Sequence, residues 1–201
     1  MDNNDRILNE FYTTLRSVHS PIVKYLNAGL NRKEIEAKIK LLNLSFPDEA
    51  YTFYNYKNGI DLEMAQKEFI EIWIVPLGTI ISLENAINRY SNWAGKMEGW
   101  KKSMFPLFES TGGDFYLLNC EKDSPNYGFV YYYSPTNVDF EFSISAFDSL
   151  GCFLETITAC WEKGIFFYNS EGFFEYDFKN YIGVASLKNK NSEYWKIYKY
   201  L

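Results

Sequence analysis

The chain has 201 residues, of which 47% are hydrophobic and 23% charged, and its formal net charge at pH 7 is −6. This length and composition are typical of one globular domain. The negative charge argues against nucleic-acid binding, which depends on a basic surface. Phe, Tyr and Trp make up 19% of the residues, which favours a core rich in β-structure.

The compartment follows from three features of the sequence. The N-terminal stretch MDNNDRILNE is polar and acidic and has no secretory signal pattern. The longest apolar tract, residues 72–83, is interrupted by a proline and a glycine and is too short to span a bilayer. The three cysteines, Cys120, Cys152 and Cys160, form no CxxC pair and are odd in number, which is typical of reduced thiols. We therefore expect a cytoplasmic protein.

The N-terminal third is predicted to be helical. Apolar residues recur at helical spacing over residues 4–18, which predicts an amphipathic helix. Ser20 and Pro21 are typical of the start of a second, short helix. Gly29 is expected to end that helix, because glycine readily adopts the left-handed conformation found after helix C-termini.

Two more helix starts follow. Asn31 and Glu34 have the spacing of a capping box, in which each side chain binds the other residue's backbone N–H. Pro47 suits the first turn of another helix, which we expect to end at Asn58-Gly59. Four short helices are therefore predicted before the first strand.

The pattern then changes to β-branched and apolar residues. Residues 71–82 predict a strand broken by a bend at 76–78. Residues 83–93 predict a helix capped by Ser82, and residues 94–103 predict a polar loop.

The most aromatic part of the chain, residues 105–133, predicts the centre of a β-sheet. Three strands are expected, at residues 105–108, 114–120 and 127–133. A bend at residues 112–114, Gly-Gly-Asp, leads into the second of these strands and is expected to need a positive φ. The turn between the second and third strands, EKDSPN, is rich in turn-forming residues.

Residues 138–144 alternate between apolar and polar side chains, which predicts a half-buried antiparallel strand. Asp139 and Glu141 would lie on its outer, acidic face.

The C-terminal part returns to helical spacing. Residues 147–163 predict a helix that stops at Gly164. Residues 165–176 are expected to be extended and residues 177–187 helical. The whole order of elements predicts an α+β fold, with a mainly antiparallel sheet and helices packed around it.

The sequence contains no recognisable catalytic constellation, so we expect no catalytic residue, cofactor or metal. His19 is the only histidine. Its position at a helix junction, far in sequence from any cysteine, favours a structural role over a catalytic triad, a dyad or a metal site. An enzyme with an unrecognised carboxylate pair stays an alternative, because such pairs are defined in space. The carboxylates near the predicted sheet are Asp114, Glu121, Asp123, Asp139 and Glu141.

Three blocks of the sequence resemble the SMI1/KNR4 family, also called the SUKH superfamily. They are FPDEAYTFYNYKNGI (46–60), FPLFESTGGDFYLLNC (105–120), and GFVYYYSP (128–135) followed by FDSLGCFLETITACWEKG (147–164). A tail NSEYWK is also similar, so that the resemblance covers about residues 35–196. The well-capped helices before residue 31 depart from the family core. We therefore describe one domain with a helical N-terminal extension (1–30) and a core (31–201).

The resemblance implies an α+β fold and, in bacteria, a non-enzymatic immunity protein that neutralises a cognate toxin, often a nuclease, by direct binding. It also implies an alternative, a regulatory or scaffold protein with a cellular partner. An acidic, aromatic surface would suit a toxin that itself binds polyanions. We expect no direct binding of nucleic acid or membrane. The expected partner-binding residues lie on the sheet's outer face and turn: Glu121, Asp123, Tyr127, Asp139 and Glu141. The competing interpretation is that they are ordinary surface residues.

Overall fold

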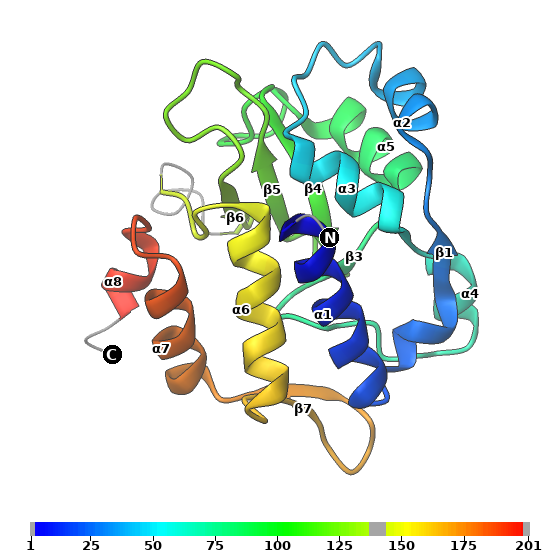
Figure 1. The fold of residues 1–201 in the computed structure, drawn as a ribbon, viewed down its shortest axis with the longest axis vertical. Helices are drawn as coiled ribbons and strands as arrows, with labels where there is room; N and C mark the ends of the chain where they lie inside the picture. The colour runs from blue at the N-terminus through cyan, green and yellow to red at the C-terminus, as the bar shows by residue number, and fades with distance from the viewer. Residues whose placement is uncertain (1–2, 137–143, 199–201) are drawn as a thin grey trace.

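The computed structural model describes residues 3–136 and 144–198 (Figure 1). The helices are α1 (Asn3–Ser17), the 3₁₀ helix η1 (Pro21–Tyr25), α2 (Arg32–Ile39), α3 (Asp48–Tyr56), α4 (Leu62–Lys67), α5 (Leu83–Trp93), α6 (Leu150–Glu162), α7 (Phe178–Lys188) and α8 (Tyr194–Tyr198). The strands are β1 (Leu26–Ala28), β2 (Lys57–Ile60), β3 (Thr79–Ile80), β4 (Met104–Glu109), β5 (Phe115–Asn119), β6 (Val130–Tyr133), β7 (Phe166–Tyr168) and β8 (Phe174–Tyr176). The predicted α+β fold is confirmed.

The central sheet is antiparallel and has the strand order β3-β4-β5-β6. Strands β1 and β2 form a separate antiparallel pair, as do β7 and β8. The three strands predicted within residues 105–133 are present as β4, β5 and β6. Strand β4 carries an irregularity between Pro106 and Phe108. A bulge is the usual way in which an inner strand accommodates a proline, which has no N–H to donate.

Both faces of the sheet are buried. Alternate residues of β5 point to opposite faces, and Tyr116 belongs to the main core whereas Phe115 belongs to a second, smaller cluster. That second cluster is covered by Trp100, whose side chain is buried and donates from Nε1 to the Met104 carbonyl oxygen at 2.9 Å. The 94–103 loop is therefore a cover for one face of the sheet.

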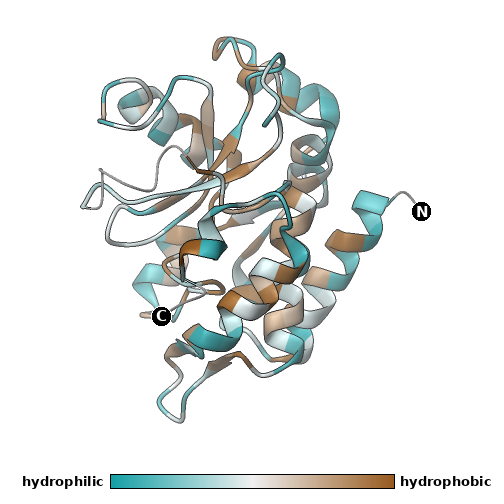
Figure 2. Ribbon diagram, turned by 90° about the vertical axis from the view of Figure 1, so that its left-hand side faces the viewer, coloured by the Kyte–Doolittle hydropathy of each residue, from teal (hydrophilic) through white to brown (hydrophobic). Residues whose placement is uncertain are grey.

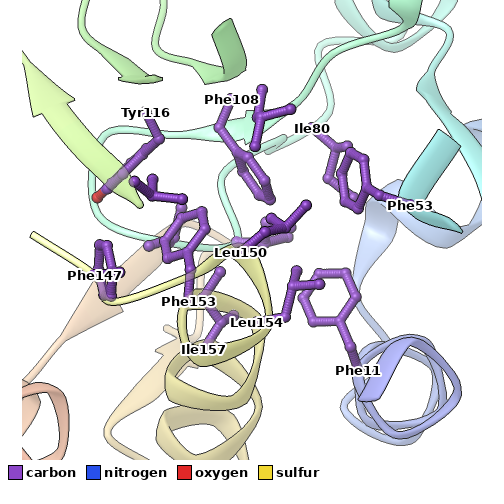
Figure 3. Packing of buried hydrophobic residues seen from close by; sticks show 14 of the residues in the cluster. Phe11, Phe53, Ile80, Phe108, Tyr116, Phe147, Leu150, Phe153, Leu154 and Ile157 are labelled. Carbon is purple, nitrogen blue, oxygen red and sulfur yellow. The ribbon is translucent and has the colours of Figure 1, made fainter. Parts of the chain in front are cut away.

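Helix α6 packs against the other face. Its Phe153 ring lies 4.9 Å from the Phe108 ring and 4.7 Å from the Tyr116 ring, centroid to centroid (Figure 3). Hydrophobic colouring follows the strands of the sheet and the parts of the helices that face the interior (Figure 2). Phe153 is fully buried, so this contact joins the sheet to the helical layer.

The N-terminal helix lies beside α6 (Figure 1). Leu8, Phe11 and Leu15 of α1 are buried in the main core, and Phe11 approaches the Leu154 side of α6 in Figure 3. Arg6 also contacts Glu155 of α6, with a nitrogen–oxygen distance of 3.4 Å. The division of the chain at residue 30 stays a prediction, but α1 itself contributes to the main core.

The expectation of four helices before the first strand is wrong. Residues 21–25 form only a 3₁₀ helix, and Leu26–Ala28 pair with Lys57–Ile60 as β1 and β2. The helix expected to end at Asn58-Gly59 therefore ends earlier, and the short helix α4 was not predicted. The reason is tertiary, because each strand is three or four residues long and depends on the other for its backbone hydrogen bonds.

Gly29 has a different role from the predicted one. It does not have a positive φ, and a Cβ at this position would lie 1.7 Å from the backbone oxygen of Asn55. The glycine is needed because the β1 segment passes very close to the end of α3, where Leu30 N donates to the Tyr54 carbonyl oxygen at 2.9 Å.

Several predicted signals are confirmed. Asn31 and Glu34 form the capping box of α2, and Ser82 caps α5 by accepting from the backbone N–H of Asn85. Gly164 follows α6 with a φ of 64°. The predicted strand over residues 71–82 is reduced to β3. Most of the predicted strand 138–144 lies outside the described residues.

Two glycines provide a matched test of this packing. Replacing Gly29 by Ala should destabilise the protein by about 2 kcal/mol or more, because the methyl group would overlap the Asn55 backbone. Replacing Gly183 by Ala should stabilise it by about 0.5–1 kcal/mol, because this helical position in α7 has no atom within 4 Å of the added Cβ. Urea unfolding followed by tryptophan fluorescence measures both. Equal effects of the two substitutions would contradict this account.

A partly buried carboxylate, that of Glu49, joins α3 to the start of α6. Glu49 accepts a hydrogen bond from the Gly151 backbone N–H at 3.3 Å. Burial raises the pKa of Glu49, and the backbone N–H groups of Gly151 and Leu150 only partly oppose this rise. The folded protein therefore holds the Glu49 proton more strongly than the unfolded chain does.

This difference predicts a pH dependence of stability. A carboxyl group with a raised folded-state pKa contributes stability that is present below its unfolded pKa and is lost as pH rises through the folded pKa. Glu49→Gln should remove this loss, so that the free energy of unfolding falls less between pH 4 and 7 in the variant than in the parent chain. Urea unfolding at a series of pH values measures it. An unchanged pH profile would show that Glu49 does not contribute.

Candidate functional site

The turn between β5 and β6, residues 121–128, is called the acidic turn here. It is held in place by Asn119, the last residue of β5. Asn119 is buried, and its side chain accepts from the Glu121 backbone N–H and donates to the Asn126 carbonyl oxygen, both at 3.0 Å. Gly128 closes the turn with a φ of 82°. The acidic turn therefore has a defined conformation, although Glu121 and Asp123 are exposed.

Tyr127 is the aromatic residue of the acidic turn. It is half-buried, and its pKa is raised by burial first and then by the nearby Cys120, Asp48 and Tyr51. The turn lies beside the start of α3, since a Cβ at Gly128 would be 3.8 Å from the Pro47 side chain. There Arg32 pairs with Asp48 at 3.2 Å and stacks on the Tyr51 ring at 4.2 Å.

The structure thus brings three of the five expected partner-binding residues together, Glu121, Asp123 and Tyr127. Asp139 and Glu141 lie outside the described residues. Within the described part of the chain, neither Glu121 nor Asp123 forms an ion pair. Their charges are therefore exposed beside a half-buried tyrosine, an arrangement that suits contact with a basic protein surface.

The Gly112-Gly113-Asp114 bend is confirmed as the entry to β5. Gly113 has a φ of 90°. The Ser110 hydroxyl accepts from the backbone N–H groups of Gly112 and Asp114 at 3.0 Å and donates to the Asp114 carboxylate at 2.7 Å. This network fixes the Asp114 side chain at the bend.

A hollow of about 490 Å³ opens next to this bend; we call it the aromatic pocket. Its floor and walls come from the 76–77 loop, the bend, β5, β6, the segment before α6, and the C-terminal elements from β8 to α8. The lining residues are Pro76, Leu77, Asp114, Tyr116, Tyr132, Ser134, Thr136, Ala146, Phe147, Tyr176, Phe178, Tyr181, Tyr194, Trp195 and Tyr198.

The rings of the aromatic pocket form a connected series. Tyr116 lies 5.5 Å from Tyr132 and 6.1 Å from Phe147, and Trp195 lies 5.4 Å from Phe147 and 5.1 Å from Tyr181, all between ring centroids. Tyr176, Phe178, Tyr194 and Tyr198 continue the series. Such edge and tilted contacts hold the walls in place.

The only acid among the lining residues of the aromatic pocket is Asp114, and these residues include no lysine, arginine or histidine. One Asp114 oxygen accepts from the Tyr132 hydroxyl at 3.1 Å and the other from Ser110. Burial raises the pKa of Tyr116 and Tyr181 well above that of a free phenol. The pocket therefore combines neutral aromatic surface with one negative charge.

The described residues contain no group of three or more potential metal ligands from His, Cys, Asp and Glu. His19 is exposed at the α1–η1 junction, with a φ of 52°. The three cysteines are free, as expected, and burial raises the pKa of Cys160 to about 12. A buried thiol with a raised pKa is a poor nucleophile. No helix within residues 3–136 and 144–198 has the length and apolarity to cross a membrane.

The fold is that of an α+β protein with an antiparallel sheet that is buried on both faces. Its acidic turn and the Asp114 carboxylate of the aromatic pocket both belong to segments that connect strands. The model of the SMI1 / KNR4 family (SUKH-1) matches residues 29–156 of the chain. The chain belongs to this family, as the resemblance predicted. The match is shorter than the expected 35–196 at the C-terminal end. A search of curated proteins found no match.

The aromatic pocket was not predicted from the sequence. Asp114, Tyr116 and Tyr132 lie within the family match, whereas the wall from Tyr176 to Tyr198 lies beyond it. The sequence signal nearest to it is the high density of aromatic residues after residue 165, from which only extended structure over residues 165–176 is predicted. The convergence of these rings with Asp114 depends on how α7 and α8 pack.

Proposed function

We propose that this protein is a non-enzymatic immunity protein that binds a cognate toxin and neutralises it directly. The observation that carries the proposal is membership of the SMI1/KNR4 (SUKH-1) family. The acidic turn supports it, because Glu121 and Asp123 are exposed and neither forms an ion pair in the described part of the chain. A nuclease toxin needs a basic surface to hold its polyanionic substrate, and an acidic partner can cover that surface.

Net charge supports the same function. At −6 the chain would attract a basic toxin over a distance of about 8–10 Å at moderate ionic strength. Such attraction speeds association, which matters for an inhibitor that must act before the toxin does. We place the encounter in the cytoplasm, where reduced thiols such as Cys120, Cys152 and Cys160 persist.

Co-expression tests the proposal directly. The product of the adjacent gene should be toxic alone and harmless together with this chain, and the two proteins should co-purify. Absence of both rescue and complex would refute the immunity role. Purification that instead recovers a housekeeping protein would favour the alternative of a regulatory scaffold.

Charge removal on the acidic turn tests the binding surface. The double variant Glu121→Gln/Asp123→Asn should slow association with the toxin by about 3- to 10-fold at low salt and should weaken the salt dependence. The control variant Glu63→Gln/Glu171→Gln removes the same charge from exposed positions on α4 and the β7–β8 turn. Surface plasmon resonance at several salt concentrations measures both. Equal slowing in the two variants would show a general charge effect and no role for the turn.

A further inference from the structure

We infer that the aromatic pocket receives an arginine side chain of the protein partner. This inference rests on the proposed function only in taking the partner to be a protein. The acidic turn and the aromatic pocket are different features: the turn joins β5 to β6 beside α3, whereas the pocket opens between the 110–114 bend and the C-terminal helices.

Charge is the first argument. Among the described residues that line the pocket, Asp114 is the only acid, and there is no lysine, arginine or histidine. The phenols are neutral at pH 7, because an ordinary tyrosine ionises only near pH 10, and burial raises the pKa values of Tyr116 and Tyr181 further. A cation entering the pocket would meet one carboxylate and no competing positive charge among these residues.

Hydrogen-bonding capacity is the second argument. Each oxygen of Asp114 accepts one hydrogen bond, from Tyr132 at 3.1 Å or from Ser110 at 2.7 Å. A carboxylate has about four lone-pair positions, so both oxygens can accept one more donor. A guanidinium presents two parallel N–H groups that match the two oxygens of a carboxylate.

The aromatic walls are the third argument. Cations are attracted to ring faces, and arginine, with its planar group, also stacks on them. Tyr176 and Phe178 are partly exposed, with 39% and 46% of their surface accessible, although both line the pocket. An entering side chain can therefore cover aromatic surface that otherwise contacts water. A lysine ammonium is compact and not planar, so it would neither bind both carboxylate oxygens in parallel nor stack on a ring as an arginine does.

The residues that follow the family match, after residue 156, form one wall of the aromatic pocket. The carboxylate comes from the matched region, whereas Tyr176, Phe178 and the rings of α7 and α8 come from residues 157–201. The C-terminal elements would thus add a specificity pocket to the family fold. A partner lacking the arginine would lose this contact but keep those at the acidic turn.

Calorimetric titration of the full chain with two short peptides tests the pocket itself. Gly-Gly-Arg-Gly-Gly should bind measurably at millimolar concentrations, and the citrulline peptide of the same shape, which lacks the charge, should bind at least about tenfold more weakly. Asp114→Asn should weaken arginine-peptide binding by about tenfold and Phe178→Ala by about 3- to 10-fold. The control Glu63→Gln, on α4 at the opposite side of the molecule in Figure 1, should change nothing.

The Phe178→Ala variant tests the pocket even if Asp114→Asn destabilises the bend. The Phe178 side chain is half-exposed and takes no part in the hydrogen bonds between Ser110 and Asp114. Equal binding of the arginine and citrulline peptides, or no effect of either substitution in folded protein, would overturn the inference.

Binding of the toxin to the same variants is a separate experiment, which distinguishes failure of this inference from failure of the proposed function. Peptide binding without any toxin complex would refute the immunity role and leave the pocket's ligand established, whereas a toxin complex unaffected by both substitutions would refute arginine capture from that partner.

Discussion

Tyr116 is the contact on which the arrangement of the molecule depends. Its ring stacks on Phe153 of α6, 4.7 Å away between centroids and nearly parallel at 28°. Its hydroxyl donates to the Pro76 carbonyl oxygen at 2.7 Å. A single buried side chain thus joins the sheet, the central helix and the 76–78 bend, and it also lines the aromatic pocket. Tyr116 therefore contributes both to the packing of the core and to the lining of the pocket.

Burial of both sheet faces decides where binding can occur. Main-core residues cover one side and the Trp100 cluster covers the other, and the aromatic pocket reaches the main-core side at Tyr116 and Tyr132. Exposed polar groups are left at the ends and edges of the strands. The acidic turn joins two strand ends and is held by the buried Asn119, and the bend that brings Asp114 to the aromatic pocket precedes β5 and is held by the buried Ser110. Rigid supports of this kind reduce the entropy that binding would otherwise lose.

The acidic turn and the aromatic pocket would contribute differently to the binding that we propose. Exposed charge on the turn would act at a distance and affect the rate of encounter. A contact with the carboxylate among the rings of the pocket would be desolvated and would affect how long a complex lasts. A member of a family that shares its central fold can acquire its own partner by changing the segments that build such a pocket.

The sequence by itself determined the elements whose signals are local. Capping residues located α2 and α5, helical spacing located α1 and α6, and aromatic runs located β4, β5 and β6. Three of the five expected site residues share one turn because they are neighbours in the chain. Only the tertiary structure decided the rest: β1 pairs with a strand 31 residues further along, and the aromatic pocket joins Asp114 to rings from residues 176–198. Such pairings depend on long-range packing, whose free energy overrides the weak local preferences of short segments.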